Sequence, residues 1–201
     1  ALAEAVQRNQ KFRISEILHT FGQEIAETVA ANYGSLRVDF AGGYQGAERN
    51  RGMFIHEDFM GTPAGFDIDC IEARWNGQFA RLSHRDVLGA LMGLGIERDR
   101  IGDLLVTNDS VKILCDQKMA EYLLVNLTKI GAVGVSCERA ELSSIAPKEE
   151  RCKEIRATVA SLRVDSIAAS GFGSSRSRAA ADIAADKLKL NWQPVKSASQ
   201  T

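Results

Sequence analysis

Residues 161–191 read SLRVDSIAASGFGSSRSRAAADIAADKLKLN, and three short elements can be recognised in them. A helix is expected from about Leu162 to Ala169, because glycines at 171 and 173 supply a turn after it. Ser175 is a typical N-cap residue and opens a second helix. The last element, Lys187 to Asn191, is a basic strand. Together these elements predict a small unit of two helices and a strand.

The second helix of this segment begins with two arginines. Arg176 and Arg178 fall in its first turn, where backbone N–H groups lack partners and the helix dipole is positive. Basic residues oppose the dipole there, so an anionic partner such as phosphate would explain both of them. The expected phosphate-contacting side chains are Arg163, Arg176, Arg178, Lys187 and Lys189, with Ser175 and Asn191 as hydrogen-bonding partners.

The charge of the chain changes sign along its length. All 201 residues together carry a formal net charge of −1. Residues 1–150 hold 16 Lys and Arg against 22 Asp and Glu, a net charge of −6, whereas residues 151–201 hold 9 against 4, a net charge of +5. Such an asymmetry is typical of a basic binding module joined to a more acidic body.

The composition is that of an ordinary globular chain, with 45% hydrophobic and 25% charged residues. The cysteines at 70, 115, 137 and 152 form no CxxC pair, so we expect reduced, packed thiols and no metal site. The sequence contains no apolar run of about 18 residues and no signal peptide, and we expect a chain that is neither exported nor membrane-spanning. It starts without Met, as expected of a piece of a longer protein.

The N-terminal part predicts a long helix followed by a strand. Apolar residues recur at near-helical spacing from Phe12 to Val29, and Gly34 offers a stop. A strand is expected from Leu36 to Phe40, followed by a glycine-rich turn. The loop around Gly61 then separates this region from a second unit.

The second unit begins with a strand from Phe66 to Trp75, in which the apolar alternation shifts phase and predicts a bulge. Asn76-Gly77 predicts a hairpin with a returning strand from Phe79 to Leu82. Ser83-His84-Arg85-Asp86 has the form of a capping box, which opens a helix ending near Gly93 or Gly95. The remaining elements are expected as strands at 104–107 and 111–115, a helix at 119–130 and a strand at 133–137.

The order strand, helix, strand, strand, helix, strand is the split βαβ pattern of ferredoxin-like and RRM-like domains. RRM-type RNA readers carry aromatic rings on a central strand, but Ser110 to Cys115 contains none. We therefore predict an α+β chain with an N-terminal αβ region at 1–62, an RRM-like central domain at 63–141, a linker at 142–157 and a C-terminal binding domain at 158–201.

The chain from Thr158 onward resembles the S4 RNA-binding domain, whose pattern runs L-D, then S-R-x-x-A, then a V-x-V-N strand. The match is carried by residues 161–165, 175–179 and 187–191. Asp182 stands where a helix leucine is usual, and Asp186 stands where the family generally has glycine. Both add negative charge close to the RNA face that the resemblance implies, and are expected to reduce affinity. The strand that closes the domain after Val195 is absent, so the S4 domain is expected to be incomplete.

Upstream, Phe40 to Arg49 and His84 to Ile96, continuing to Asp103, look like the YlmH family, whose relatives include cyanobacterial and plastid photosystem II S4-domain proteins. The resemblance covers nearly the whole chain. It implies a non-catalytic RNA-binding protein that contacts rRNA or tRNA on the large ribosomal subunit and acts in rescue of stalled nascent-chain complexes. It further implies a monomer without cofactor, located in the cytoplasm, or in the plastid stroma if the source is a plant.

Two other functions stay open. An RNA-modifying enzyme of the pseudouridine synthase type would use the S4-like domain to bind its substrate. Residues 161–165 resemble the R-L-D of those enzymes, but Asp165 lies within the S4-like element itself, and no base–nucleophile or cofactor constellation accompanies it. A protein-binding adaptor would use the acidic region 1–150. A second contact surface could be formed by Tyr44, Arg49, Arg51, Arg85, Arg98 and Arg100, although capping or a structural role is at least as common for such residues.

Overall fold

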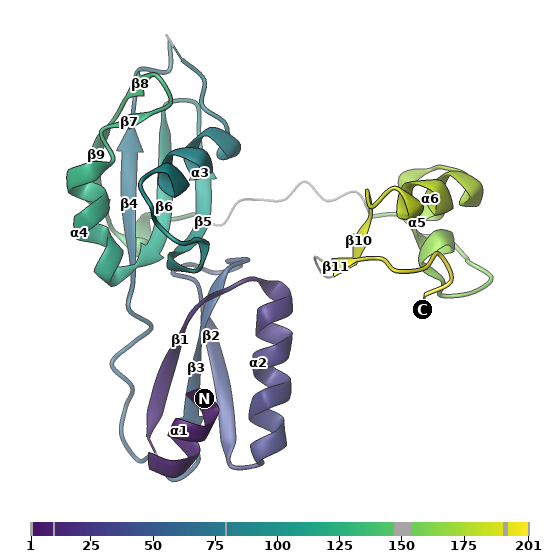
Figure 1. Cartoon of the computed structure of the whole chain (residues 1–201), viewed down its shortest axis with the longest axis horizontal. Helices are drawn as coiled ribbons and strands as arrows, with labels where there is room; N and C mark the ends of the chain where they lie inside the picture. The colour runs from purple at the N-terminus through teal and green to yellow at the C-terminus, as the bar shows by residue number, and fades with distance from the viewer. Residues whose placement is uncertain (1, 10, 79, 147–153, 191–192, 201) are drawn as a thin grey trace. The chain divides into compact units, whose positions relative to one another are not determined.

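The computed structural model describes residues 2–9, 11–78, 80–146, 154–190 and 193–200. The chain is a mixed α+β protein that divides into two compact units, Ala1–Pro147 and Lys148–Thr201 (Figure 1). Within the described ranges, no helix is long and apolar enough to cross a membrane. The first unit contains an N-terminal sheet and a central sheet, and the second contains the basic C-terminal elements.

The N-terminal sheet has the strand order β1-β3-β2 and is antiparallel throughout. Helices α1 and α2 pack against it, and α2 runs alongside the strands (Figure 1). Buried Val6 of α1 and Ala26 of α2 meet Phe54 of the sheet in one cluster. The elements are α1 (Leu2–Asn9), β1 (Phe12–Leu18), α2 (Thr20–Tyr33), β2 (Leu36–Ala41) and β3 (Asn50–His56).

The prediction of one long helix from Phe12 to Val29 is wrong, because its first part is strand β1. The pairing of β1 with β3 shifts between Ile14 and Ile17. This irregularity changes the phase of the apolar residues within the strand, so their spacing resembles that of a helix. The helix stop was predicted correctly: Gly34 caps α2 with a φ of 68°, and its N–H donates to the Ala31 carbonyl.

The central sheet has the strand order β5-β6-β4-β9, and all its neighbours are antiparallel. Helices α3 and α4 cover one face, where Val87 and Leu91 of α3 and Leu123 of α4 are fully buried with Ile71 and Ile113 of the sheet. The elements are β4 (Ile68–Arg74), α3 (His84–Gly93), η1 (Arg98–Arg100), β5 (Ile101–Val106), β6 (Ser110–Asp116), α4 (Gln117–Asn126), β7 (Lys129–Ile130), β8 (Val133–Gly134), β9 (Ser136–Ala140) and η2 (Leu142–Ser144). The predicted order of strands and helices is present, with the short β7–β8 hairpin added.

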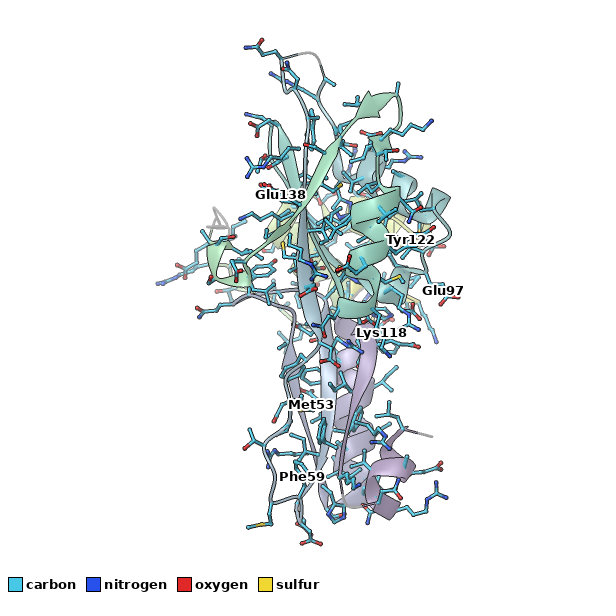
Figure 2. All side chains as sticks on the ribbon, turned by 90° about the vertical axis from the view of Figure 1, so that its left-hand side faces the viewer. Met53, Phe59, Glu97, Lys118, Tyr122 and Glu138 are labelled. Atoms are coloured by element: carbon cyan, nitrogen blue, oxygen red, sulfur yellow. The ribbon has the colours of Figure 1, made fainter. Side chains whose placement is uncertain are left out.

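The capping box that opens α3 is confirmed. The Ser83 hydroxyl accepts from the Asp86 N–H at 3.3 Å, and the Asp86 carboxylate accepts from the Ser83 N–H at 2.8 Å. Helix α4 ends at Asn126, four residues before the predicted end. It presents Tyr122 on its outer side near Glu97 (Figure 2), and the Tyr122 hydroxyl donates to the Leu94 carbonyl at 3.0 Å. This bond ties the outer side of α4 to the end of α3.

Two predictions about β4 are wrong. The strand pairs with β6 in unbroken register from Ile68 to Arg74, so it contains no bulge. Its apolar residues shift phase because both faces are buried: Cys70 and Ile71 point to opposite faces and are both nearly inaccessible. The predicted hairpin is also absent, since β6 and β9 occupy both edges of β4. Of the predicted returning strand, Phe79 lies outside the described residues and 80–82 form no strand.

The C-terminal unit contains α5 (Val164–Phe172), α6 (Arg176–Ala184), β10 (Lys189–Leu190) and β11 (Gln193–Pro194). Small residues bring the two helices together: Ala168 and Ala169 of α5 are buried with Ala179 of α6. The end of the chain returns to the start of α5, where the Val164 N–H donates to the Gln200 carbonyl at 2.8 Å. Two helices and a basic strand were predicted here and are present. The described residues after Val195 form no strand, and β11 lies just before it.

Candidate nucleic-acid interface

The carboxylate of Asp165 joins the two helices of the C-terminal unit. It lies in the first turn of α5 with a side chain only 7% exposed, and the Arg163 guanidinium donates to both of its oxygens, at 3.1 and 3.0 Å. Arg176, at the start of α6, donates to the same carboxylate at 3.0 Å. The hydrogen bonds from Arg163, and next those from Arg176, hold the pKa of Asp165 well below its usual range. This carboxylate is therefore ionised and fixed by two arginines.

Both arginines keep much of their surface in water. Their side chains are 38% exposed at Arg163 and 55% exposed at Arg176. A guanidinium has five N–H donors, and Asp165 uses two from Arg163 and one from Arg176. Since the carboxylate neutralises one of the two charges, the trio carries a net charge of +1. The remaining donors form no hydrogen bond with any described residue.

Ser175 and Arg178 complete the start of α6. The Ser175 hydroxyl accepts from the Arg178 N–H at 3.2 Å and caps the helix, as predicted. The Arg178 side chain is exposed and forms no ion pair with any described residue. The first turn of α6 therefore combines two arginines with backbone N–H groups, as the sequence predicted.

The other predicted basic residues do not contact Asp165, Arg163 or Arg176. Lys187 pairs with Asp182 at 3.3 Å, and Lys189 is exposed on β10. Asp186 adopts a left-handed conformation with a φ of 53° just after α6. No contact in the described residues joins Lys187 or Lys189 to Asp165 or its arginines, and Asn191 lies outside the described residues.

Most side chains of the predicted second surface are already bound to other residues of the first unit. Asp103 of β5 accepts from the Tyr44 hydroxyl at 2.7 Å and from the Arg49 N–H at 3.1 Å. The Arg49 guanidinium donates to the carbonyls of Ile101 and Arg98. Burial, and next the bond to Asp103, raises the pKa of Tyr44 far above its usual range. These residues bind the turn after β2 to the central sheet.

The arginines at 51, 98 and 100 also have partners inside this unit. Arg51 pairs with Asp116 at 3.6 Å, and Arg100 pairs with the same carboxylate at 2.9 Å. Burial opposes ionisation of Asp116, but the Lys118 N–H and Arg100 lower its pKa below the usual range. Burial, and next the neighbouring charge of Arg49, lowers the pKa of Arg98 to about 10. Among the six residues of the predicted second surface, only Arg85 is exposed without a described hydrogen bond or ion pair, and its charge acts on the neighbouring Asp86.

The face of the central sheet that α3 and α4 leave open is partly covered by other segments. Leu142 and Ile145 pack on Cys70 and Leu114 of the sheet, together with Tyr44 from the N-terminal part. No aromatic side chain lies on β6, as the sequence already indicated. This face therefore lacks the exposed rings on which RRM-type readers stack bases.

Comparisons with known proteins agree with this division of the chain. Residues 62–144 match the family described as "Putative RNA-binding domain in YlmH", and residues 162–201 match the S4 domain family. The "Ribosome-associated protein quality control protein P2" of Bacillus subtilis is 28% identical over 194 residues, which cover 96% of this chain and 75% of that protein. The chain belongs to the YlmH family of S4-domain RNA-binding proteins.

A solved structure of a YlmH protein supports the same assignment. The "Cell division protein ylmH from Streptococcus pneumoniae" superposes with a TM-score of 0.59 at 25% sequence identity. The match covers 70% of this chain and 85% of that chain. In this YlmH-family chain, the two arginines that share Asp165 lie within the S4 match. The two that share Asp116 lie in the first unit, outside that match.

Sequence reasoning on this YlmH-family chain missed the anchoring role of Asp165. It noted Asp165 only as part of the L-D element of the S4 pattern and as a resemblance to an enzyme motif. A usable signal was present, because Arg163 and Asp165 are two residues apart at a helix start, where an acidic side chain is favoured and an arginine is not. The participation of Arg176 carried no such signal, since it depends on how α6 packs on α5.

Proposed function

We propose that this chain is a non-catalytic RNA-binding protein that contacts rRNA or tRNA on the large ribosomal subunit. The observation that carries the proposal is the pair of arginines fixed by Asp165 beside the exposed Arg178, within a unit that matches the S4 family. The Bacillus subtilis relative bears the name of a ribosome-associated quality control protein, which supports a role in quality control of stalled nascent chains. Its place of action would be the cytoplasm, or the stroma of a plastid.

Phosphates would bind at the start of α6. Asp165 takes the inner N–H groups of Arg163 and Arg176, and the outer ones are aligned before RNA arrives. Holding the side chains in place lowers the entropy that binding costs. Arg178 and the first backbone N–H groups of α6 extend the site. Because arginine donates in a planar fork, two of its N–H groups can reach one phosphate.

The central region supports the proposal in a smaller way. Its element order and its strand order β5-β6-β4-β9 are those of a split βαβ fold, and we propose an RRM-like domain at 63–141. The same proposal places the N-terminal region at 1–62, the linker at 142–157 and the S4 domain at 158–201, although the first residues of that linker range, Leu142 to Ile145, pack on the central sheet. Since its sheet lacks exposed rings, this domain would contact RNA through shape and charge or position the S4 domain.

The enzyme alternative is not favoured. A catalytic carboxylate must reach its substrate, whereas Asp165 is nearly buried and bound by two arginines. In the described residues, no three His, Cys, Asp or Glu side chains group to hold a metal ion. The two buried cysteines have pKa values raised by burial, to about 11 at Cys70 and about 12 at Cys115. Mass mapping of modified bases after incubation with ribosomal RNA tests this alternative directly.

The proposal is tested by replacing the exposed arginines. Arg176→Ala with Arg178→Ala should weaken binding of ribosomal RNA about tenfold or more at near-physiological salt, because charge-assisted contacts are lost. The dependence of log K on log salt should become shallower by about 1.5–2 for two lost phosphate contacts. The measurement is a binding titration of the full chain at four or more salt concentrations.

Arg37→Ala provides the matched control, because Arg37 is an exposed arginine of β2 with one acidic neighbour, Asp39. It removes one positive charge from the first unit, half of what the double variant removes, and should leave both affinity and slope nearly unchanged. Equal effects of the two changes would mean that net charge alone drives binding. An unchanged affinity in the double variant would remove Arg176 and Arg178 from the interface.

A further inference from the structure

Phe172 is the most exposed aromatic side chain in the described part of the chain. It is the last residue of α5 and is 77% exposed. Burying a phenylalanine stabilises a protein by about 1.5–3 kcal/mol, so an exposed ring of this kind forgoes a large contribution to folding. Its exposure is therefore a feature that folding stability does not explain.

The surroundings of Phe172 leave the ring accessible. Its two chain neighbours, Gly171 and Gly173, have no side chains, and a Cβ atom added at either would meet no atom within 4 Å. Gly173 adopts a φ of 60° and ends the helix. Because 77% of Phe172 is exposed, its ring is accessible to another flat ring.

Phe172 also lies close to the basic start of α6. Arg176 follows it by four positions along the chain, so the two Cα atoms are at most about 14 Å apart. Arg176 and Arg178 are exposed and positively charged, and Ser175 caps the helix between them and Phe172. An aromatic side chain next to exposed arginines is the combination by which proteins hold an unpaired nucleotide, with the base stacked and the phosphate paired.

We infer that Phe172 stacks on an unpaired base of the bound RNA. The inference rests on the proposed RNA-binding function and names the ligand class more closely: a helical RNA with a bulged or terminal unpaired nucleotide next to the phosphates held by Arg176 and Arg178. Stacking on an aromatic side chain tolerates any base, because every base has a flat face. The contact therefore selects RNA shape and not sequence.

The test compares two hairpin RNAs that differ only by one bulged nucleotide, with 2-aminopurine at the bulge. The full chain should bind the bulged hairpin about tenfold more tightly than the paired one and should quench the 2-aminopurine fluorescence. Phe172→Ala should remove both the preference and the quenching while still binding the paired hairpin. Phe172→Trp should keep both, because it retains a flat ring.

Ile167→Ala is the matched control, since Ile167 is a half-exposed apolar residue of the same helix. It should keep the preference for the bulge. Unfolding curves should coincide for the wild type and the Phe172→Ala chain, which shows that the variant folds. A preference that survives in Phe172→Ala, or that is missing in the wild type while Arg176→Ala still weakens binding, overturns the stacking contact alone. A wild type that binds neither hairpin contradicts the proposed function itself.

Discussion

Two aspartates of this chain each hold two arginines, and their surroundings differ. Asp116 binds Arg51 and Arg100 in the first unit, and Asp165 binds Arg163 and Arg176 in the second. The side chain of Arg51 is 10% exposed and also donates to the carbonyls of Ser15 and Asp67. No described carbonyl accepts from the arginines at Asp165.

This difference separates a structural arginine from one suited to binding. A guanidinium whose donors all point at protein acceptors has none left for a ligand, and its removal leaves those acceptors unpaired. A guanidinium that donates only one or two N–H groups to a carboxylate keeps its other N–H groups for phosphate. Arg51 carries this contrast. Arg100 does not, because its side chain is 35% exposed and its described hydrogen bond goes to Asp116 alone.

The largest expected effect is a loss of stability when Arg51, the buried partner of Asp116, is replaced. Arg51→Ala leaves the carbonyls of Ser15 and Asp67 without their charged donor, while Asp116 keeps Arg100. It should lower the free energy of unfolding by about 3–5 kcal/mol, because each hydrogen bond to a charged group contributes about 1.5–3 kcal/mol. Urea denaturation of the full chain measures it. Binding of RNA by the remaining folded protein should be unchanged at low denaturant. A loss of RNA affinity equal to that of Arg176→Ala would erase the distinction between the two groups.

A smaller effect with a defined pH window is expected at Asp165. Its pKa is depressed in the folded state, so its ionisation stabilises the fold fully above the unfolded value of about 3.9 and this contribution is lost as pH falls further. Asp165→Asn should therefore lower the stability of the C-terminal unit at neutral pH. The difference from wild type should shrink below about pH 4.

Thermal unfolding at several pH values between 7 and 2, followed by a probe in the C-terminal unit, measures this difference. Asp182→Asn is the control, since Asp182 forms an exposed pair with Lys187. A constant difference between Asp165→Asn and wild type over the whole range would show that the carboxylate contributes through its shape and not through its charge.

The smallest effect concerns the position where this chain departs from the S4 pattern. Asp186 has a φ of 53°, a conformation that glycine adopts without strain. Asp186→Gly should raise stability by about 0.5–1 kcal/mol through relief of that strain. Since it also removes a negative charge from the basic unit, RNA affinity should rise slightly at low salt. Denaturation and titration of the same samples would show both changes.

The sequence predicted best where local signals decide the structure. Ser175 and the Ser83–Asp86 box marked helix starts, and Gly34 marked a helix end, because caps depend on neighbouring residues only. The failures came from tertiary contacts. The irregular pairing of β1 with β3 disguised a strand as a helix, and burial on both faces of β4 imitated a bulge.

The candidate site was predicted in part for the same reason. Arg176 and Arg178 could be placed at a helix start from the residues alone, but their relation to Asp165 depends on the packing of α5 against α6. Likewise, the sequence grouped Arg49, Arg51, Arg98 and Arg100 as a surface. Nothing local reveals that backbone carbonyls accept from the first three, or that Asp116 accepts from Arg100. Only the fold distinguishes arginines that are bound from arginines that are free to bind.

The most direct test of this account is a crosslinking map of the full chain on intact large ribosomal subunits. RNA crosslinks should concentrate between Arg163 and Arg178, at the starts of α5 and α6, and should disappear in the chain with Arg176→Ala and Arg178→Ala. Crosslinks confined to residues 1–146, or an unchanged pattern in that variant, would contradict it.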